Sequence, residues 1–145
     1  MTLFLHGSNT MTITKEQLLN APESEYMNDE QLAFFKGLLE ELKIQTLQDI
    51  DAGRNELSHP PEMNDEVDRA AYEEESSIRL RTLDRDRKLI PKIDAALKRI
   101  ANKEYGYCLE SGEPIGIPRL LTRPTAEFCI EIKTLAEMKD RNYSK

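Results

Sequence analysis

Two adjacent prolines divide this chain into two long helical patterns, and this break limits the possible folds more than any other feature. Pro60 and Pro61 remove two backbone donors and push the residue before each of them out of the helical region. Apolar side chains on the N-terminal side recur at steps of three and four residues, at Leu32, Phe35, Leu39 and Leu42. Those on the C-terminal side keep coiled-coil spacing, at Leu83, Ile90, Ile93, Leu97 and Ile100. Two long helices joined by a short turn lie antiparallel, so residues 28–104 are expected to form a coiled-coil hairpin with its tip near residues 58–70.

The helix ends carry recognisable signals. Asn28 followed by Gln31 predicts an N-cap with an approximate capping box, and this helix should run to about Leu57. Asn64 is expected to cap the second helix. Pro91 lies inside that helix, where proline costs about 3 kcal/mol, so a bend is expected at Ile90 and Pro91. The second helix should end between residues 102 and 106, with Gly106 suited to a left-handed cap.

The two ends of the chain predict smaller structures. Residues 1–27 are expected to be a flexible N-terminal segment, with a short helix at Lys15–Leu19 that Pro22 closes. Residues 105–145 are expected to form a small finger-like knuckle followed by a C-terminal helix from Pro124 to about Arg141. The predicted fold class is therefore mainly α: a long antiparallel coiled-coil hairpin, a small zinc-finger-like region and a C-terminal helix.

Charge and composition exclude several classes of protein. The net charge of −7 argues against a protein whose main partner is the nucleic-acid backbone, so direct DNA binding is not expected. No apolar run is long enough to span a membrane and no signal peptide begins the chain, which indicates a cytoplasmic protein. Motifs of nucleophile elbows, phosphate loops or zinc proteases do not occur, so the protein is not expected to be an enzyme.

The knuckle carries half of a zinc-finger ligand set. Cys108 and Ser111 occupy one pair of ligand positions, and Cys129 and Ile132 occupy the other. A structural zinc site needs four thiolate or imidazole ligands, so no metal is expected. Nearby apolar side chains could fill the space instead, at Ile115, Ile117, Leu120, Leu121, Phe128 and Leu135. The two thiols then have three possible states: buried free thiols, a redox-sensitive disulfide, or ligands of a weakly bound zinc ion.

Two charged groups stand out on the predicted hairpin. Asp65 and Asp68 lie three residues apart, so both carboxylates share one face of the opening turn of the second helix. Stabilisation of the helix dipole, about 0.3 to 1 kcal/mol for each, would also explain them. Basic residues line one face of the same helix, at Arg81, Arg85, Lys88 and Lys92. This row could be a solvated flank paired across the seam with Glu40, Glu41 or Asp49.

Several blocks in one order carry a resemblance that covers most of residues 26–140. They are Tyr26-Met27-Asn28, Asp65 to Ala71 followed by Glu73-Glu74-Glu75, Arg85 to Ile90, Tyr105-Gly106-Tyr107-Cys108, and Arg123-Pro124-Thr125-Ala126 leading to Thr134-Leu135-Ala136-Glu137. In these blocks the chain resembles the DksA/TraR family of bacterial transcription factors, which bind RNA polymerase directly rather than DNA.

The resemblance implies a function and a set of site residues. In the family, the hairpin enters the secondary channel of RNA polymerase, and its acidic tip, matched here by Asp65, Asp68 and Ala70, acts near the active centre. Family positions that help to bind the alarmone ppGpp are matched by Arg85, Lys92, Arg123 and Lys133. The chain departs from the family pattern at Glu66, where proline is common, and at Pro91, beside Lys92.

The expected function is a monomeric, zinc-independent regulator that binds bacterial RNA polymerase and acts with ppGpp on open-complex stability in the stringent response. Two other functions remain open. The first is a Gre-like cleavage factor, whose tip carboxylates recruit a metal ion and make polymerase hydrolyse its transcript. The second is a structural coiled-coil adaptor unrelated to polymerase.

Overall fold

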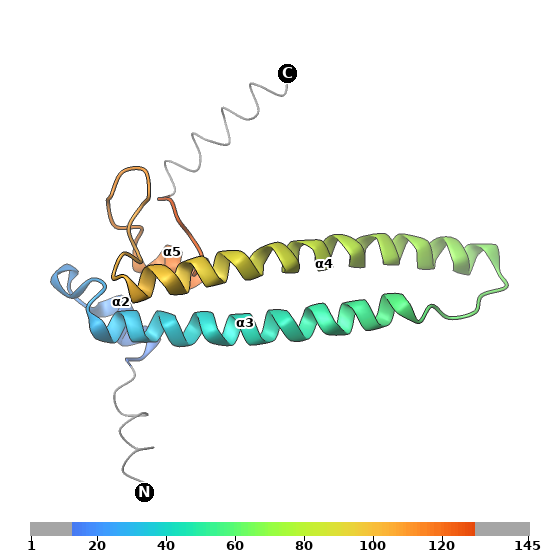
Figure 1. The fold of residues 1–145 in the computed structure, drawn as a ribbon, viewed down its shortest axis with the longest axis horizontal. Helices are drawn as coiled ribbons and strands as arrows, with labels where there is room; N and C mark the ends of the chain where they lie inside the picture. The colour runs from blue at the N-terminus through green and yellow to red at the C-terminus, as the bar shows by residue number, and fades with distance from the viewer. Residues whose placement is uncertain (1–12, 130–145) are drawn as a thin grey trace, which may run out of the picture. The chain divides into compact units, whose positions relative to one another are not determined.

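The computed structural model describes residues 13–129, and within that range it is helical with no β-strand, as the mainly α prediction expects. Its elements are α2 (Lys15–Asn20), the 3-10 turn η1 (Glu23–Glu25), α3 (Asp29–Ser58), α4 (Glu66–Ala101) and α5 (Ile117–Thr122) (Figure 1). None of the described helices is both long and apolar enough to cross a bilayer. The chain separates into two compact units, residues 40–94 and the remainder.

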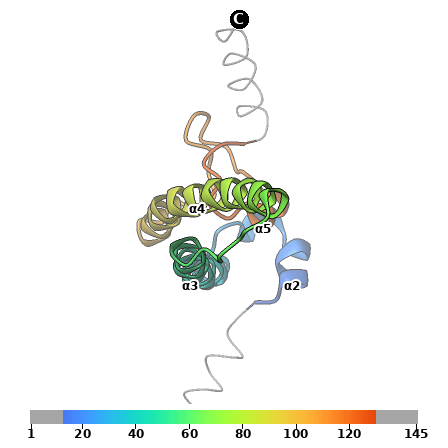
Figure 2. The same cartoon turned by 90° about the vertical axis from the view of Figure 1, so that its right-hand side faces the viewer.

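The tip unit, residues 40–94, is an antiparallel pair of helical segments. The loop that contains both prolines joins the end of α3 to the start of α4, and Figure 2 views this loop end-on. Two exposed ion pairs join the helices in this register: Lys43 Nζ lies 2.7 Å from Asp94, and Arg79 Nε lies 3.2 Å from Glu56. The buried seam includes Thr46, Ile50, Leu83 and Ile93. The apolar spacing therefore predicted the pairing of the two helices correctly.

The helix α4 differs from its prediction at both ends. It begins one residue later than expected, because Asp65 and not Asn64 is its cap: Asp65 Oδ1 accepts the Val67 amide at 3.0 Å. It continues through Pro91 to Ala101. Its C-terminal cap is Lys103, with φ of 60°, and not Gly106; the Lys103 and Glu104 amides donate to the Ile100 and Arg99 carbonyls in the pattern of a Schellman motif.

The base unit contains α2, the first part of α3, the end of α4, the knuckle and α5. Its core is largely aromatic and aliphatic, and Phe35 and Tyr105 are fully buried with ring centroids 5.4 Å apart. The start of α3 confirms the predicted cap, since the Gln31 amide donates to Asn28 Oδ1 at 2.9 Å. The Gln31 side chain reaches back to the Met27 amide instead of the Asn28 amide. The second bond of the capping box therefore goes to the amide of Met27, one residue before the cap residue Asn28.

The N-terminal segment is more tightly held than predicted over its described part, residues 13–27. Thr14 and Gln17 form a capping box for α2, and Leu18 is buried as α2 packs against α5. The Tyr26 hydroxyl donates to the Gly106 carbonyl at 2.6 Å and accepts the Gly116 amide at 2.9 Å. One phenol therefore ties this segment to two points of the knuckle. Residues 1–12 lie outside the described part.

The C-terminal prediction also needs correction. The short helix α5 at Ile117–Thr122 was not predicted, although Gly116 before it and Pro118 in its first turn are a helix-start signal. The helix predicted to begin at Pro124 does not begin there, because residues 124–129 are turns and irregular backbone. The rest of that predicted helix lies outside the described residues.

Candidate functional site

The tip carries two exposed carboxylates, Asp65 and Asp68, and only the first is used to cap a helix. Asp65 Oδ1 caps α4 through the Val67 amide, and the Asp65 carbonyl accepts the Arg69 amide at 3.0 Å. The Arg69 side chain donates to the Met63 carbonyl at 3.2 Å, which fixes the loop against the helix. Asp68 is exposed and forms no ion pair or side-chain hydrogen bond with any residue between 13 and 129. The Asp68 carboxylate, unlike that of Asp65, is therefore free to contact a partner. Ala70, also exposed, follows in the same stretch of α4.

The basic row on α4 is exposed and mostly without acidic partners. Arg81, Arg85, Lys88 and Lys92 all face solvent. The partners predicted across the seam, Glu40, Glu41 and Asp49, are wrong, because the only ion pair of the row among the described residues joins Lys88 to Asp84, one turn earlier on the same helix. Such an exposed pair contributes little to folding. The row is thus a cationic face on an acidic protein, and its other three members, Arg81, Arg85 and Lys92, have no ion-pair partner among the described residues.

The knuckle is a tight hairpin-like turn around Cys108. The Cys108 amide donates to the Glu113 carbonyl and the Gly112 amide to the Cys108 carbonyl, each at 2.8 Å. The Ile115 amide donates to the Gly106 carbonyl at 2.8 Å, and Tyr107 pairs with Pro114 as an isolated bridge. Gly112 has φ of 75°, a conformation that suits glycine in such a turn. The local backbone is therefore a tight turn closed by its own hydrogen bonds.

The side chains of this knuckle do not supply a zinc-ligand set. Cys108 is buried and Cys129 is half-buried, both as free thiols. The Ser111 hydroxyl is used within the turn, where it accepts the Glu113 amide at 3.3 Å. Ile132, at the fourth ligand position, lies outside the described residues and has no donor atom. Two thiols and a hydroxyl do not fit a tetrahedral structural site, and residues 13–129 contain no cluster of three or more potential metal ligands.

Hydrogen bonds prepare the Cys108 thiol for ionisation. Burial opposes the charged form, but bonds from the Ser111 hydroxyl and from the amides of Cys129, Ser111 and Glu110 outweigh it and lower the pKa of Cys108 to about 6. This shift could not be predicted from the residues alone, because no basic residue neighbours the cysteine and the donors are mostly backbone amides.

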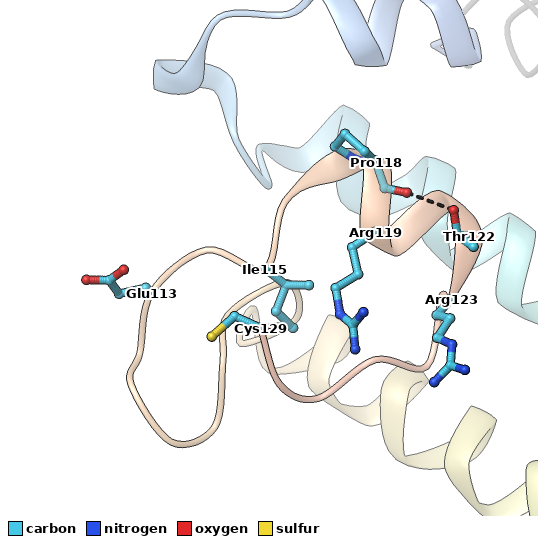
Figure 3. A pocket seen from close by; sticks show the side chains of 7 residues that line it. All are labelled: Glu113, Ile115, Pro118, Arg119, Thr122, Arg123 and Cys129. Atoms are coloured by element: carbon cyan, nitrogen blue, oxygen red, sulfur yellow. Dashed lines mark hydrogen bonds between the residues drawn. The ribbon is translucent and has the colours of Figure 1, made fainter. Parts of the chain in front are cut away.

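An open pocket of about 610 Å³ lies beside the knuckle in the base unit (Figure 3). Arg119 from α5 and Arg123, just after it, extend their guanidinium groups along the same side of the pocket, and Cys129 lies on the loop opposite α5. Arg119 Nε donates to the Phe128 carbonyl at 3.1 Å. Neither arginine has an ion-pair partner within the described part of the chain. The pocket is therefore lined by two positive charges and by one acidic residue, Glu113, and of the two arginines only Arg123 was predicted.

The predicted cation set is divided between the two units. Arg85 and Lys92 belong to the tip unit, and Arg123 belongs to the base unit. Lys133 lies outside the described residues. Sequence reasoning missed Arg119, although its spacing of four residues from Arg123 would place both on one face of a helix. The short helix that makes this spacing meaningful was itself not predicted.

Comparisons with known proteins agree with this geometry. The family model for the N-terminal domain of the DnaK suppressor protein DksA matches residues 31–100, and that for the prokaryotic dksA/traR C4-type zinc finger matches residues 103–131. The RNA polymerase-binding transcription factor DksA of Escherichia coli is 46% identical over 124 residues, which cover 83% of this chain and 80% of that protein. The chain belongs to the DksA family.

Other DksA proteins give the same result. The RNA polymerase-binding transcription factor DksA of Haemophilus influenzae is 42% identical over 82% of this chain and 83% of its own length. A solved structure of transcription factor DksA2 from Pseudomonas aeruginosa matches with a TM-score of 0.66 and 42% identity, covering 88% of this chain and 99% of that one. These relatives carry the names of transcription factors and not of enzymes. The C4-type description differs from this chain, in which Ser111 and Ile132 replace two cysteines.

Proposed function

We propose that this protein regulates bacterial transcription initiation by binding RNA polymerase through its secondary channel. The observation that carries the proposal is the Asp68 carboxylate, exposed at the tip and without a partner among the described residues. The family relatives are named as RNA polymerase-binding factors, which supplies the partner. Polymerase is a cytoplasmic enzyme, so the protein would act in that compartment. It is also proposed to act as a monomer.

The mechanism is a difference in affinity between two states of polymerase. A factor shifts an equilibrium only by the difference between its affinities for the two states. A tip that binds more tightly before the open complex forms shifts the equilibrium away from that complex. Promoters with short-lived open complexes, such as those of ribosomal RNA, are then inhibited most.

The alarmone ppGpp is the proposed co-effector, bound at the polymerase interface by Arg85, Lys92, Arg123 and Lys133. Arg85, Lys92 and Arg123 are exposed and have no ion-pair partner within residues 13–129. A polyanionic nucleotide needs several cations, and arginine adds bidentate contacts to phosphate. Unneutralised cations on an acidic protein support this role.

Zinc independence is the second part of the proposal. The incomplete donor set supports it, and so does the apolar packing in the base unit, where Ile115 and Leu120 are buried. Burial of a large aliphatic side chain stabilises a fold by about 1.5 to 3 kcal/mol. Several such side chains can offset the loss of a structural metal.

Two assays on bacterial RNA polymerase test the function against its rivals. The first measures the lifetime of open complexes on a ribosomal RNA promoter, and the second measures transcript cleavage in backtracked complexes. We expect a shorter lifetime, a further decrease with ppGpp, and no cleavage. Transcript cleavage would identify a Gre-like factor instead. No effect in either assay would favour the structural coiled-coil adaptor.

A further inference from the structure

The missing ligands raise the question of what joins the two halves of the finger in this chain. In a four-cysteine finger, one metal ion binds both pairs of ligands and so holds the second pair against the first. In this chain the first pair is Cys108 and Ser111, and the second begins at Cys129. The segment 124–129, which leads to Cys129, must therefore be held by other contacts.

The Tyr105 phenol holds the start of this segment. Its hydroxyl donates to the Pro124 carbonyl at 2.6 Å, although the two residues are 19 positions apart. The side chain is fully buried, and its ring lies against Phe35, which fixes where the hydroxyl points. Burial raises the pKa of Tyr105 well above its ordinary value, so the phenol keeps its proton. The Pro124 carbonyl is therefore held by a rigid donor.

The Arg119 guanidinium holds the end of the segment. Arg119 Nε donates to the carbonyl of Phe128, the residue before Cys129, at 3.1 Å. Between these two points the Leu109 amide donates to the Glu127 carbonyl at 2.9 Å. The segment is thus bonded at residues 124, 127 and 128 to three different parts of the base unit.

These contacts also restrain Arg123. Its amide donates to the Arg119 carbonyl at 2.7 Å, at the end of α5. The next carbonyl along the chain, that of Pro124, is held by Tyr105. The backbone of Arg123 is therefore restrained on both sides, while its side chain remains exposed in the pocket.

We propose that Tyr105 and Arg119 form a polar clamp that replaces the joining role of the metal and acts as the positioning element for Arg123. The first half of the inference stands on the hydrogen bonds alone. The second half rests on the proposed role of Arg123 in effector binding. Neither clamp residue is a metal ligand or an effector ligand in this scheme.

The test compares the clamp with a restored metal site. Tyr105→Phe removes one hydroxyl, and Arg119→Lys keeps the charge but removes the Nε–H donor. Both are made in the natural chain and in a Ser111→Cys, Ile132→Cys variant loaded with one zinc ion per chain. Hydrogen exchange of the amides of residues 123 and 125–129 is the readout, because Pro124 has no N–H, and it needs no polymerase. Tyr107→Phe is the matched control, because the Tyr107 hydroxyl forms no hydrogen bond with the described residues.

In the natural chain we expect the double clamp variant to exchange these amides at least tenfold faster, with Tyr107→Phe unchanged. In the zinc-loaded variant the same substitutions should change the rate less than twofold. Equal acceleration in both backgrounds would show ordinary packing contacts and overturn the proposal. Failure of the four-cysteine variant to bind zinc would also overturn it, because the clamp would then not hold the knuckles where a metal could join them.

A second arm tests the positioning of Arg123. The ppGpp-dependent part of promoter inhibition should fall several-fold in Arg119→Lys and return in the zinc-loaded variant. The exchange rates could follow the prediction while the ppGpp-dependent part of promoter inhibition stays unchanged. That result would support the clamp but contradict its role in positioning Arg123. If the natural chain has no effect on polymerase at all, the proposed function fails, and the exchange experiment still decides the clamp.

Discussion

Replacing Asp68 with asparagine is expected to abolish the effect of the protein on a ribosomal RNA promoter while leaving the fold intact. The substitution removes one negative charge and changes the side-chain shape little. Asp68 is exposed and unpaired within the described residues, so folding loses only its interaction with the helix dipole, about 0.3 to 1 kcal/mol. We expect promoter inhibition to fall at least tenfold in a run-off transcription assay.

Two neighbouring carboxylates provide controls for this prediction. Glu73→Gln removes an exposed charge further along the same helix and should change inhibition less than twofold. Asp65→Asn keeps the cap, because asparagine caps helices about as well as aspartate, so it tests the Asp65 charge without melting the turn. Full activity of Asp68→Asn beside unchanged stability would exclude the tip mechanism.

Replacing Gly106 with alanine is expected to cause the largest loss of stability, about 2 to 4 kcal/mol, through crowding and backbone strain together. Gly106 has φ of 95°, and an added Cβ would lie 2.7 Å from Met27 Cγ and 3.2 Å from the Tyr26 hydroxyl. The methyl group would thus push on a buried side chain and on the phenol that bonds the Gly106 carbonyl. Urea unfolding followed by circular dichroism measures the loss.

Gly112 is the matched control, since it has a similar positive φ of 75° but no atom within 4 Å of an added Cβ. Gly112→Ala should therefore cost only the backbone strain, about 1 to 2 kcal/mol. An equal cost at both glycines would show that the close approach of Met27 contributes nothing. Crowding would then not explain why glycine occupies position 106.

The long elements were predictable because their signals are repeated many times. The apolar seam recurs over several turns, and the Pro60-Pro61 break leaves one way to connect two helices, so the mainly α fold is confirmed. Single-residue signals were less reliable. Asn64 and Asp65 are both good caps, and only the structure shows that the Asp65 carboxylate takes the Val67 amide. Likewise, Lys103 adopts the left-handed cap because the buried Tyr105 fixes where the chain must turn, which outweighs the preference for glycine.

The candidate sites show the same limit. Asp68 and the basic row were found from spacing, since one helix fixes which residues share a face. The ion pairs of the basic row were not predicted, because pairing depends on the exact register of the helices and on competing acidic residues in the same helix. Lys88, for example, pairs with Asp84 of its own helix. Tyr26, Tyr105 and Arg119 were missed because their hydrogen bonds go to backbone carbonyls outside their own helical turns, 80, 19 and 9 positions away. No periodicity indicates a contact of that kind.

The most direct test of the central claim is transcription from a ribosomal RNA promoter by bacterial RNA polymerase, using protein freed of metal with a chelator, with and without ppGpp. We expect inhibition by the metal-free protein at the same concentration as by untreated protein, strengthened by ppGpp. Inhibition that needs added zinc would contradict metal independence, and absence of inhibition under all conditions would contradict the proposed function itself.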